Sequence, residues 1–119
     1  MTGLFVAVGG ALGAISRFSL GKLVARLLPG VFPWGTLIIN VLGSFALGVL
    51  SGMAAQGQVS EDLKYFLGIG FLGAFTTFST FGYESVILLE GGSLAAGITY
   101  IVASVVSCLI ASWLGLNIA

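Results

Sequence analysis

Four long apolar stretches, separated by short polar connections, constrain this 119-residue chain more than any other feature. Each is close to the ~20 residues that a helix needs to cross a bilayer. Only 7% of the residues are charged, against about 25% in an ordinary soluble domain. Four spans use most of these residues and leave no room for a soluble domain among them. We therefore predict a single all-α integral membrane domain over residues 1–119, with four transmembrane helices at approximately 3–28, 34–55, 63–89 and 94–116.

The residue types that are scarce exclude several classes of function. Histidine is absent and cysteine occurs once, so the commonest metal ligand and physiological proton shuttle is missing. No nucleophile–base pair stands out, and the glycines lie within apolar spans rather than in the strand-to-helix turn of a nucleotide site. The net charge is zero, which does not favour a nucleic-acid partner. We predict a protein of the lipid bilayer that is not an enzyme.

The third span carries an unusual polar run, GIGFLGAFTTFSTFGYE, over residues 68–84. On a regular helix of about 100° per residue, its phenylalanines fall on one side and its hydroxyls and Glu84 largely on the other. The span 63–89 would also reach about 40 Å as one helix, beyond a hydrocarbon core of ~30 Å. A break near 73–80, close to mid-membrane, would reconcile the lengths. The run is either a packing helix whose hydroxyls bond its own carbonyls or an ion-binding pathway element.

Three residues outside this run have two interpretations each. Arg17 lies near the end of the first span, where it is either a snorkelling anchor or a structural or anion-attracting residue at a vestibule. Asn40 places an amide well inside the second span, either as interhelical glue or as part of a pathway. Cys108 in the fourth span is most simply a small apolar filler.

The distribution of basic residues predicts an unusual assembly. Lys22 and Arg26 lie on one side of the membrane and Lys64 on the other, so the positive-inside rule gives little preference for either orientation. Small residues recur every four positions on several spans, a pattern that lets helices approach closely. Four helices barely enclose a pathway. We therefore expect the chain to insert in both orientations and to pack with a second copy.

The polar groups inside the spans point to an anion as the cargo. They are mostly neutral hydroxyls, an amide and a phenol, all able to donate hydrogen bonds. Phenylalanine ring edges add positive partial charge. The carboxylates that a cation exporter would need are absent from mid-membrane unless Glu84 dips inward.

Three motifs carry a resemblance to a known family: GALGAISRF at 10–18, GTLIINVLGSF at 35–45 and GFLGAFTTFSTFGYE at 70–84. They resemble the Fluc (CrcB-like) family of fluoride channels, and the resemblance covers essentially the whole chain. It implies a passive, fluoride-selective channel that lowers cytoplasmic fluoride. It also implies an antiparallel, dual-topology homodimer with two pores and a structural sodium ion (Na⁺) at the dimer centre, multi-pass in the cell inner (plasma) membrane.

The same resemblance assigns roles to individual residues. Asn40 would donate a hydrogen bond in the pore, and Phe78 and Phe81 would contact fluoride with their ring edges. Backbone carbonyls of Gly73 and Thr76 would hold the sodium ion. The full set expected along the fluoride pathway shares a polar group or an aromatic ring: Asn40, Phe78, Thr80, Phe81, Glu84, Tyr100 and Ser104.

Two alternatives from other classes stay open at this point. A small multidrug-type exporter has similar length, four spans and dual topology, but it would need a membrane-embedded carboxylate in its first span. A non-transporting assembly subunit would explain the small-residue stripes but not Asn40 or the polar run. Phe75 and Cys108 also depart from the residues expected in the fluoride-channel family, and their effect on a pore is open.

Overall fold

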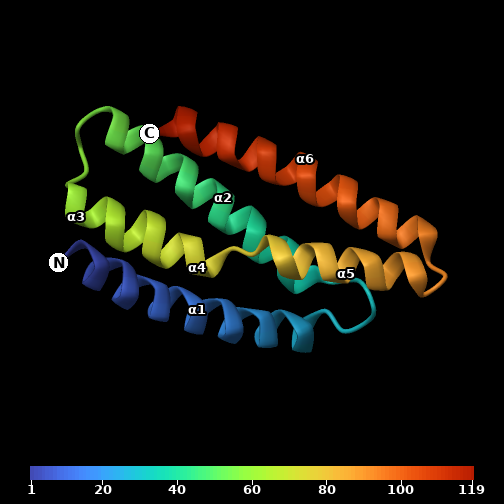
Figure 1. Ribbon diagram of the computed structural model, residues 1–119. Helices are drawn as coiled ribbons and strands as arrows, with labels where there is room; N and C mark the ends of the chain where they lie inside the picture. The colour runs from blue at the N-terminus through green and yellow to red at the C-terminus, as the bar shows by residue number, and fades with distance from the viewer.

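The computed structural model describes residues 1–119 as four long helical segments that lie side by side and alternate in direction (Figure 1). They are α1 (Thr2–Leu27), α2 (Trp34–Ala55), a composite third segment (Glu61–Glu90) and α6 (Leu94–Ile118). Both termini and the α2–α3 connection lie at one end of the bundle, and the other two connections lie at the opposite end. Each segment is long and apolar enough to cross a membrane. The prediction of an all-helical, multi-pass membrane protein is confirmed.

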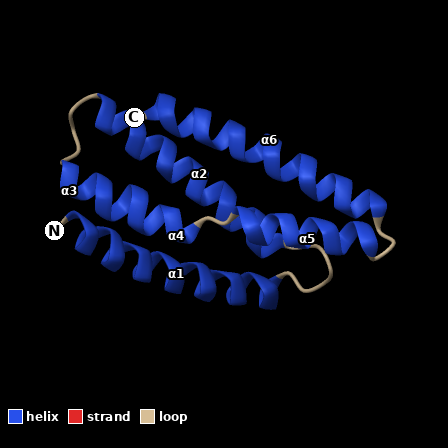
Figure 2. Ribbon diagram, viewed as in Figure 1, coloured by secondary structure: helices blue, strands red, loops and turns tan.

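The third segment is not a uniform helix. It begins as α3 (Glu61–Leu63), widens into the π-helix η1 (Lys64–Leu72) and returns to α-helix in α4 (Gly73–Phe75). Thr76 and Thr77 are extended, with ψ values of 160° and 126°, before α5 (Phe78–Glu90) continues. Figure 2 draws these two residues as a connection between α4 and α5.

The ends of the segments follow local chemistry. The third segment begins at Glu61, two residues before the predicted start, because the Ser60 hydroxyl accepts a hydrogen bond from the Leu63 N–H and caps the first turn. It ends at Glu90, where Gly91 and Gly92 form the turn and Gly92 has a φ of +82°, a conformation that glycine adopts without strain.

Glycines bring the backbones of neighbouring helices into direct contact. A Cβ built at Gly9 would overlap the Phe66 carbonyl of η1, and one built at Gly13 would overlap that of Phe71. The predicted close approach at the glycines of the first span is therefore confirmed, but it occurs within one chain. Packing within one chain already uses these glycines. Their spacing therefore does not by itself support packing with a second copy, contrary to the expectation from the sequence.

The α2–α6 contact gives a test of this packing. A Cβ at Gly48 would overlap the Ser112 carbonyl oxygen, whereas one at Gly82 of α5 meets nothing within 4 Å. We expect Gly48→Ala to lower the free energy of unfolding by about 1–3 kcal/mol through overpacking. Gly82→Ala should be neutral or stabilising by up to ~1 kcal/mol because alanine favours helix. Thermal unfolding in detergent measures both, and equal midpoints for the two variants would contradict the packing described.

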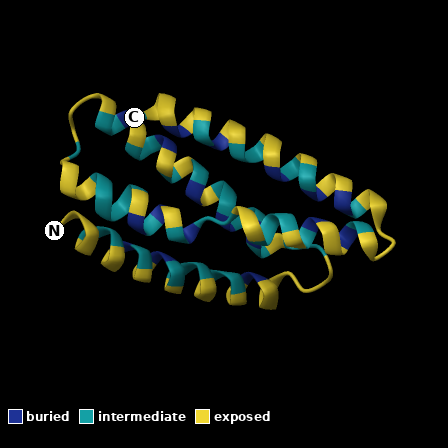
Figure 3. Cartoon of the chain, in the orientation of Figure 1, coloured by how far each residue is buried: buried dark blue, intermediate teal, exposed yellow.

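Few residues are buried (Figure 3), and large apolar side chains are exposed on every segment. The exposed large side chains are leucine, isoleucine, valine and aromatic residues on all four segments. Such a surface suits hydrocarbon, where a lipid tail is as apolar as leucine. Inside the bundle, polar side chains gather in two places, and both places adjoin the interruption at Thr76 and Thr77.

Candidate ion pathway

Asn40 holds the interruption of the third segment with both ends of its amide. Its Nδ2 donates to the Thr77 carbonyl oxygen at 3.0 Å, and its Oδ1 accepts from the Thr77 N–H at 2.9 Å. The Thr77 hydroxyl in turn accepts from the Thr80 N–H at 3.3 Å and caps α5. An asparagine has two N–H donors, so one remains outside this pair of hydrogen bonds.

These contacts divert the donors that two backbone carbonyls would normally use. In an uninterrupted α-helix the Thr77 N–H would donate to the Gly73 carbonyl and the Thr80 N–H to the Thr76 carbonyl. Here Asn40 and the Thr77 hydroxyl take those donors instead. The Gly73 and Thr76 carbonyls are therefore among the carbonyls whose helical donors are lost at this point of the chain.

Arg17 binds the same region from α1. Its Nε donates to the Ala74 carbonyl oxygen at 3.0 Å, across 57 residues of sequence. A guanidinium has five N–H donors, and the Nε contact is the one hydrogen bond that Arg17 makes within the chain. Arg17 thus contacts the end of α4 rather than the membrane surface alone, which supports the structural interpretation of this residue.

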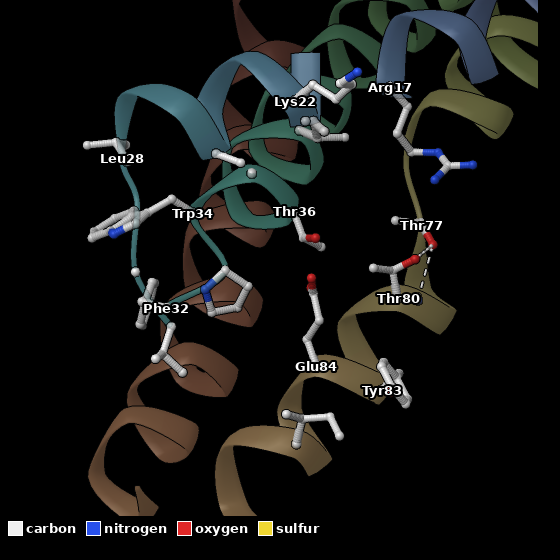
Figure 4. A pocket seen from close by; sticks show the side chains of 18 of the residues that line it. Arg17, Lys22, Leu28, Phe32, Trp34, Thr36, Thr77, Thr80, Tyr83 and Glu84 are labelled. Carbon is white, nitrogen blue, oxygen red and sulfur yellow. Dashed lines mark hydrogen bonds between the residues drawn. The ribbon is translucent and has the colours of Figure 1, made fainter. Parts of the chain in front are cut away.

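A cavity of about 610 Å³, which we call the outer cavity, lies between the end of α1, the start of α2 and α5 (Figure 4). Its charged lining residues are Arg17, Lys22 and Glu84. In Figure 4 the Glu84 carboxylate points toward Thr36 of α2, and Thr77 and Thr80 lie on the same wall as Glu84, at the start of α5. Two cations against one carboxylate give this cavity a positive balance.

A second cavity of about 300 Å³, the inner cavity, lies between α2, the interruption, the first turn of α5 and α6. Its wall includes Asn40, Phe78, Phe81 and Ser104. The Ser104 hydroxyl is buried and has no hydrogen-bond partner. Leaving a buried hydroxyl unpaired costs about 1–3 kcal/mol, and no acceptor within the chain takes this donor.

Tyr100 lines neither cavity, but it contacts one residue from the wall of each. It is fully buried, and its hydroxyl donates to Glu84 Oε1 at 3.0 Å. Its ring lies 5.4 Å from that of Phe81, which lies 5.7 Å from that of Phe78. These centroid distances are within the range of favourable aromatic pairs.

The phenylalanines of the run 68–84 do not share one helical face, and that expectation is wrong. Phe75 is buried and stacks on Phe71 at 5.8 Å, while Phe78 is 82% exposed. The extended residues Thr76 and Thr77 reset the rotation of the chain between them, so a constant 100° per residue does not apply across the interruption.

The structure brings most of the residues expected along the pathway into two adjoining groups. Asn40, Phe78, Phe81 and Ser104 line the inner cavity. Thr80 and Glu84 line the outer cavity, together with Arg17. Of the two residues expected at a sodium site, Thr76 lines the inner cavity, whereas Gly73 is exposed and lines neither.

Sequence reasoning gave no pathway role to Thr77 and Ser112. Thr77 lines both cavities, and its hydrogen-bond partner Asn40 lines the inner one. The preference for threonine at a helix N-cap could have marked it. Ser112 lines the inner cavity four residues beyond Cys108, and continuing the four-residue spacing from Ser104 would have found it.

This arrangement can bind a small anion weakly at several points. The wall of the inner cavity contains an amide, an unpaired hydroxyl and two aromatic side chains, all neutral. Of these two cavities, only the outer one has cationic side chains in its wall. Conduction requires sites that bind well enough to admit an ion and weakly enough to release it, and neutral donors meet that condition better than buried charges.

Comparison with known proteins places the whole chain in one group. A family model described as CrcB-like protein, Camphor Resistance (CrcB), matches residues 4–116. The chain is 44% identical to the Fluoride-specific ion channel FluC of Geobacter sulfurreducens, over 98% of this chain and 94% of that protein. It is likewise 44% identical to the protein of that name from Novosphingobium aromaticivorans, over 96% and 92%, and 41% identical to the one from Shewanella halifaxensis, over 94% and 90%.

Proposed function

The chain belongs to the CrcB-like family, and on that premise we propose that it is a passive, fluoride-selective channel that lowers cytoplasmic fluoride. Relatives over 40% identical are named fluoride-specific ion channels. The observation that carries the proposal is that two cavities with polar residues in their walls share Thr77, which Asn40 holds by two hydrogen bonds. A channel needs no catalytic group, and the protein is not an enzyme.

The route follows the residues from the charged to the neutral cavity. Fluoride enters the outer cavity, where Arg17 and Lys22 raise the local anion concentration. It passes Thr77 into the inner cavity, where the second Asn40 N–H and the Ser104 hydroxyl replace water molecules of the fluoride hydration shell. The ring edges of Phe78 and Phe81 complete the shell with partial positive charge.

The two alternatives gain no support from the relatives or from the cavities. A multidrug-type exporter needs an acidic residue in its first span, but the charged residues of α1 are all basic. The only carboxylate in the outer and inner cavities is Glu84, and it accepts from Tyr100. A subunit without a transport role would not require the unpaired Ser104 hydroxyl and the Asn40 amide in the wall of one cavity.

Fluoride efflux from liposomes tests the function directly. Liposomes loaded with fluoride and containing the purified protein should release it down its gradient, as followed by a fluoride electrode, without an added proton gradient or cation substrate. Chloride-loaded liposomes are the matched comparison. Release of chloride at the same rate would contradict selectivity, and no release of either ion would contradict a channel.

The protein is a multi-pass membrane protein, and we place it in the cell inner (plasma) membrane as an antiparallel, dual-topology homodimer. Phe78 supports the dimer: it lines the inner cavity yet is 82% exposed in one chain. A ring edge can contact an ion there only if the open side of the cavity is covered. A second copy would cover it, and we place the interruption at Thr76 and Thr77 near mid-membrane, where such a chain–chain contact would bury it.

Labelling of the α2–α3 connection tests the topology. Gln58→Cys in a Cys108→Ser background puts one thiol on an exposed loop. Because two orientations are expected, a membrane-impermeant thiol reagent added to cells should label about half of the protein, and permeabilisation should expose the rest. Complete labelling from one side, or none, would contradict dual topology.

A structural sodium ion at the dimer centre also belongs to the proposal. The residues fit the ion, because the Gly73 and Thr76 carbonyls lack their helical donors and carbonyl oxygens suit hard cations. Sodium would supply the positive charge that satisfies these oxygens. This chain's part is to keep the oxygens free, through the hydrogen bonds of Asn40 and Thr77.

Stability measured in different salts tests the sodium site without reference to flux. A ligand that binds only the folded protein stabilises it by about 2.7 kcal/mol at a hundredfold excess over its Kd. We expect the thermal unfolding midpoint in detergent to rise with sodium chloride but not with choline chloride at equal ionic strength. Identical midpoints in the two salts would remove the sodium site while leaving the channel proposal intact.

A further inference from the structure

The wall of the inner cavity contains a thiol that no part of the conduction route uses. Cys108 of α6 lies one turn from Ser104 and one turn from Ser112, and all three side chains line this cavity. It is the only cysteine of the chain and is partly exposed. The expectation that Cys108 is a small apolar filler therefore gives way to a thiol on a cavity wall.

A second observation at the same wall points to a small guest. The Ser104 hydroxyl is more than nine-tenths buried, lines the cavity and has no partner. A sealed apolar pocket would not hold an unpaired donor, because its desolvation is uncompensated. The space beside Cys108 is thus polar enough to admit water and small solutes.

We propose that Cys108 is a covalent modification site, at which small disulfides and thiosulfonates attach to the cavity wall and obstruct the passage. Only the effect on flux rests on the proposed function; the modification itself does not. A bonded group would occupy part of the cavity of about 300 Å³, whose wall also includes Ser104 and Phe81. Fluoride would then lose both free volume and access to donors.

The chemistry is ordinary thiol exchange with methyl methanethiosulfonate as the probe. The Cys108 thiolate sulfur attacks the methylthio sulfur of the reagent. The sulfur–sulfur bond of the reagent breaks, a new disulfide forms between Cys108 and the methylthio group, and methanesulfinate leaves with the electron pair. The thiol proton passes to water. A dithiol reductant reverses the step by the same exchange.

The test treats the full-length protein in liposomes and reads two quantities. Intact mass should increase by one methylthio group per chain, and fluoride efflux should fall at least about tenfold relative to untreated protein, equivalent to ~1.4 kcal/mol. Dithiothreitol should restore both. Cys108→Ser and Cys108→Ala, each compared with its own untreated rate, should show no response to the reagent.

A matched control moves the thiol off the cavity. Gln58 lies on the α2–α3 connection, is exposed and is not part of the cavity wall, so Cys108→Ser with Gln58→Cys should gain the mass without losing flux. Labelling of wild-type protein only after unfolding would overturn the modification site. Labelling with undiminished flux would overturn the obstruction. Untreated protein that conducts no fluoride would instead contradict the proposed function.

Discussion

Replacement of Phe81 by isoleucine is expected to lower fluoride efflux by about tenfold or more. The ring of Phe81 lies on the wall of the inner cavity and between those of Phe78 and Tyr100. Isoleucine keeps much of the bulk but loses the ring edge and its partial positive charge. Aromatic contacts of this kind contribute about 0.5–1.5 kcal/mol each, and each ~1.4 kcal/mol in a barrier is tenfold in rate. The efflux rate in liposomes measures the effect.

Phe75→Ile is the matched control. Phe75 comes from the same run of sequence but is buried against Phe71 and lines neither cavity. The substitution should cost some stability through altered packing and leave the efflux of folded protein largely unchanged. Efflux that survives Phe81→Ile but fails with Phe75→Ile would place the pathway on the other side of this segment.

The bundle was predictable because each membrane-spanning helix can be identified from the composition and length of its own segment. Twenty apolar residues between polar connections determine a membrane helix, and Pro29, Gly30 and Pro33 mark the first boundary. The close approach of α1 to η1 followed from glycines spaced four apart. These are local rules, and the structure follows them within one or two residues at the ends of helices.

The candidate pathway was predictable in its residue types but not in its arrangement. A helical wheel assumes constant rotation per residue, and the extended pair Thr76 and Thr77 violates it. That pair is held by Asn40, which is 37 residues away in sequence. A contact of this kind depends on how α2 packs beside the third segment, and no periodicity within either segment encodes it. The division into two cavities follows from the same contact.

Asn40→Asp is expected to reduce fluoride efflux at least as strongly as Phe81→Ile. An aspartate can still accept from the Thr77 N–H, but an ionised carboxylate has no donor for the Thr77 carbonyl. Two acceptors would then face each other where Asn40 now donates at 3.0 Å. The second N–H, which the proposed route uses, is lost as well, and a negative charge on the cavity wall repels the anion. Efflux from liposomes at neutral pH measures the sum of these effects.

Asn40→Ala separates the pathway role of this residue from its role as interhelical glue. Alanine removes both hydrogen bonds to Thr77 without adding charge, and each lost bond costs about 0.5–1.5 kcal/mol. If Asn40 is only glue, both variants should lose thermal stability and efflux together. If it lies on the pathway, Asn40→Asp should conduct far less than Asn40→Ala among samples that unfold at similar temperatures. Equal efflux from the two variants, at equal stability, would contradict a donor role for the Asn40 amide and leave Thr77 as the only residue joining the two cavities.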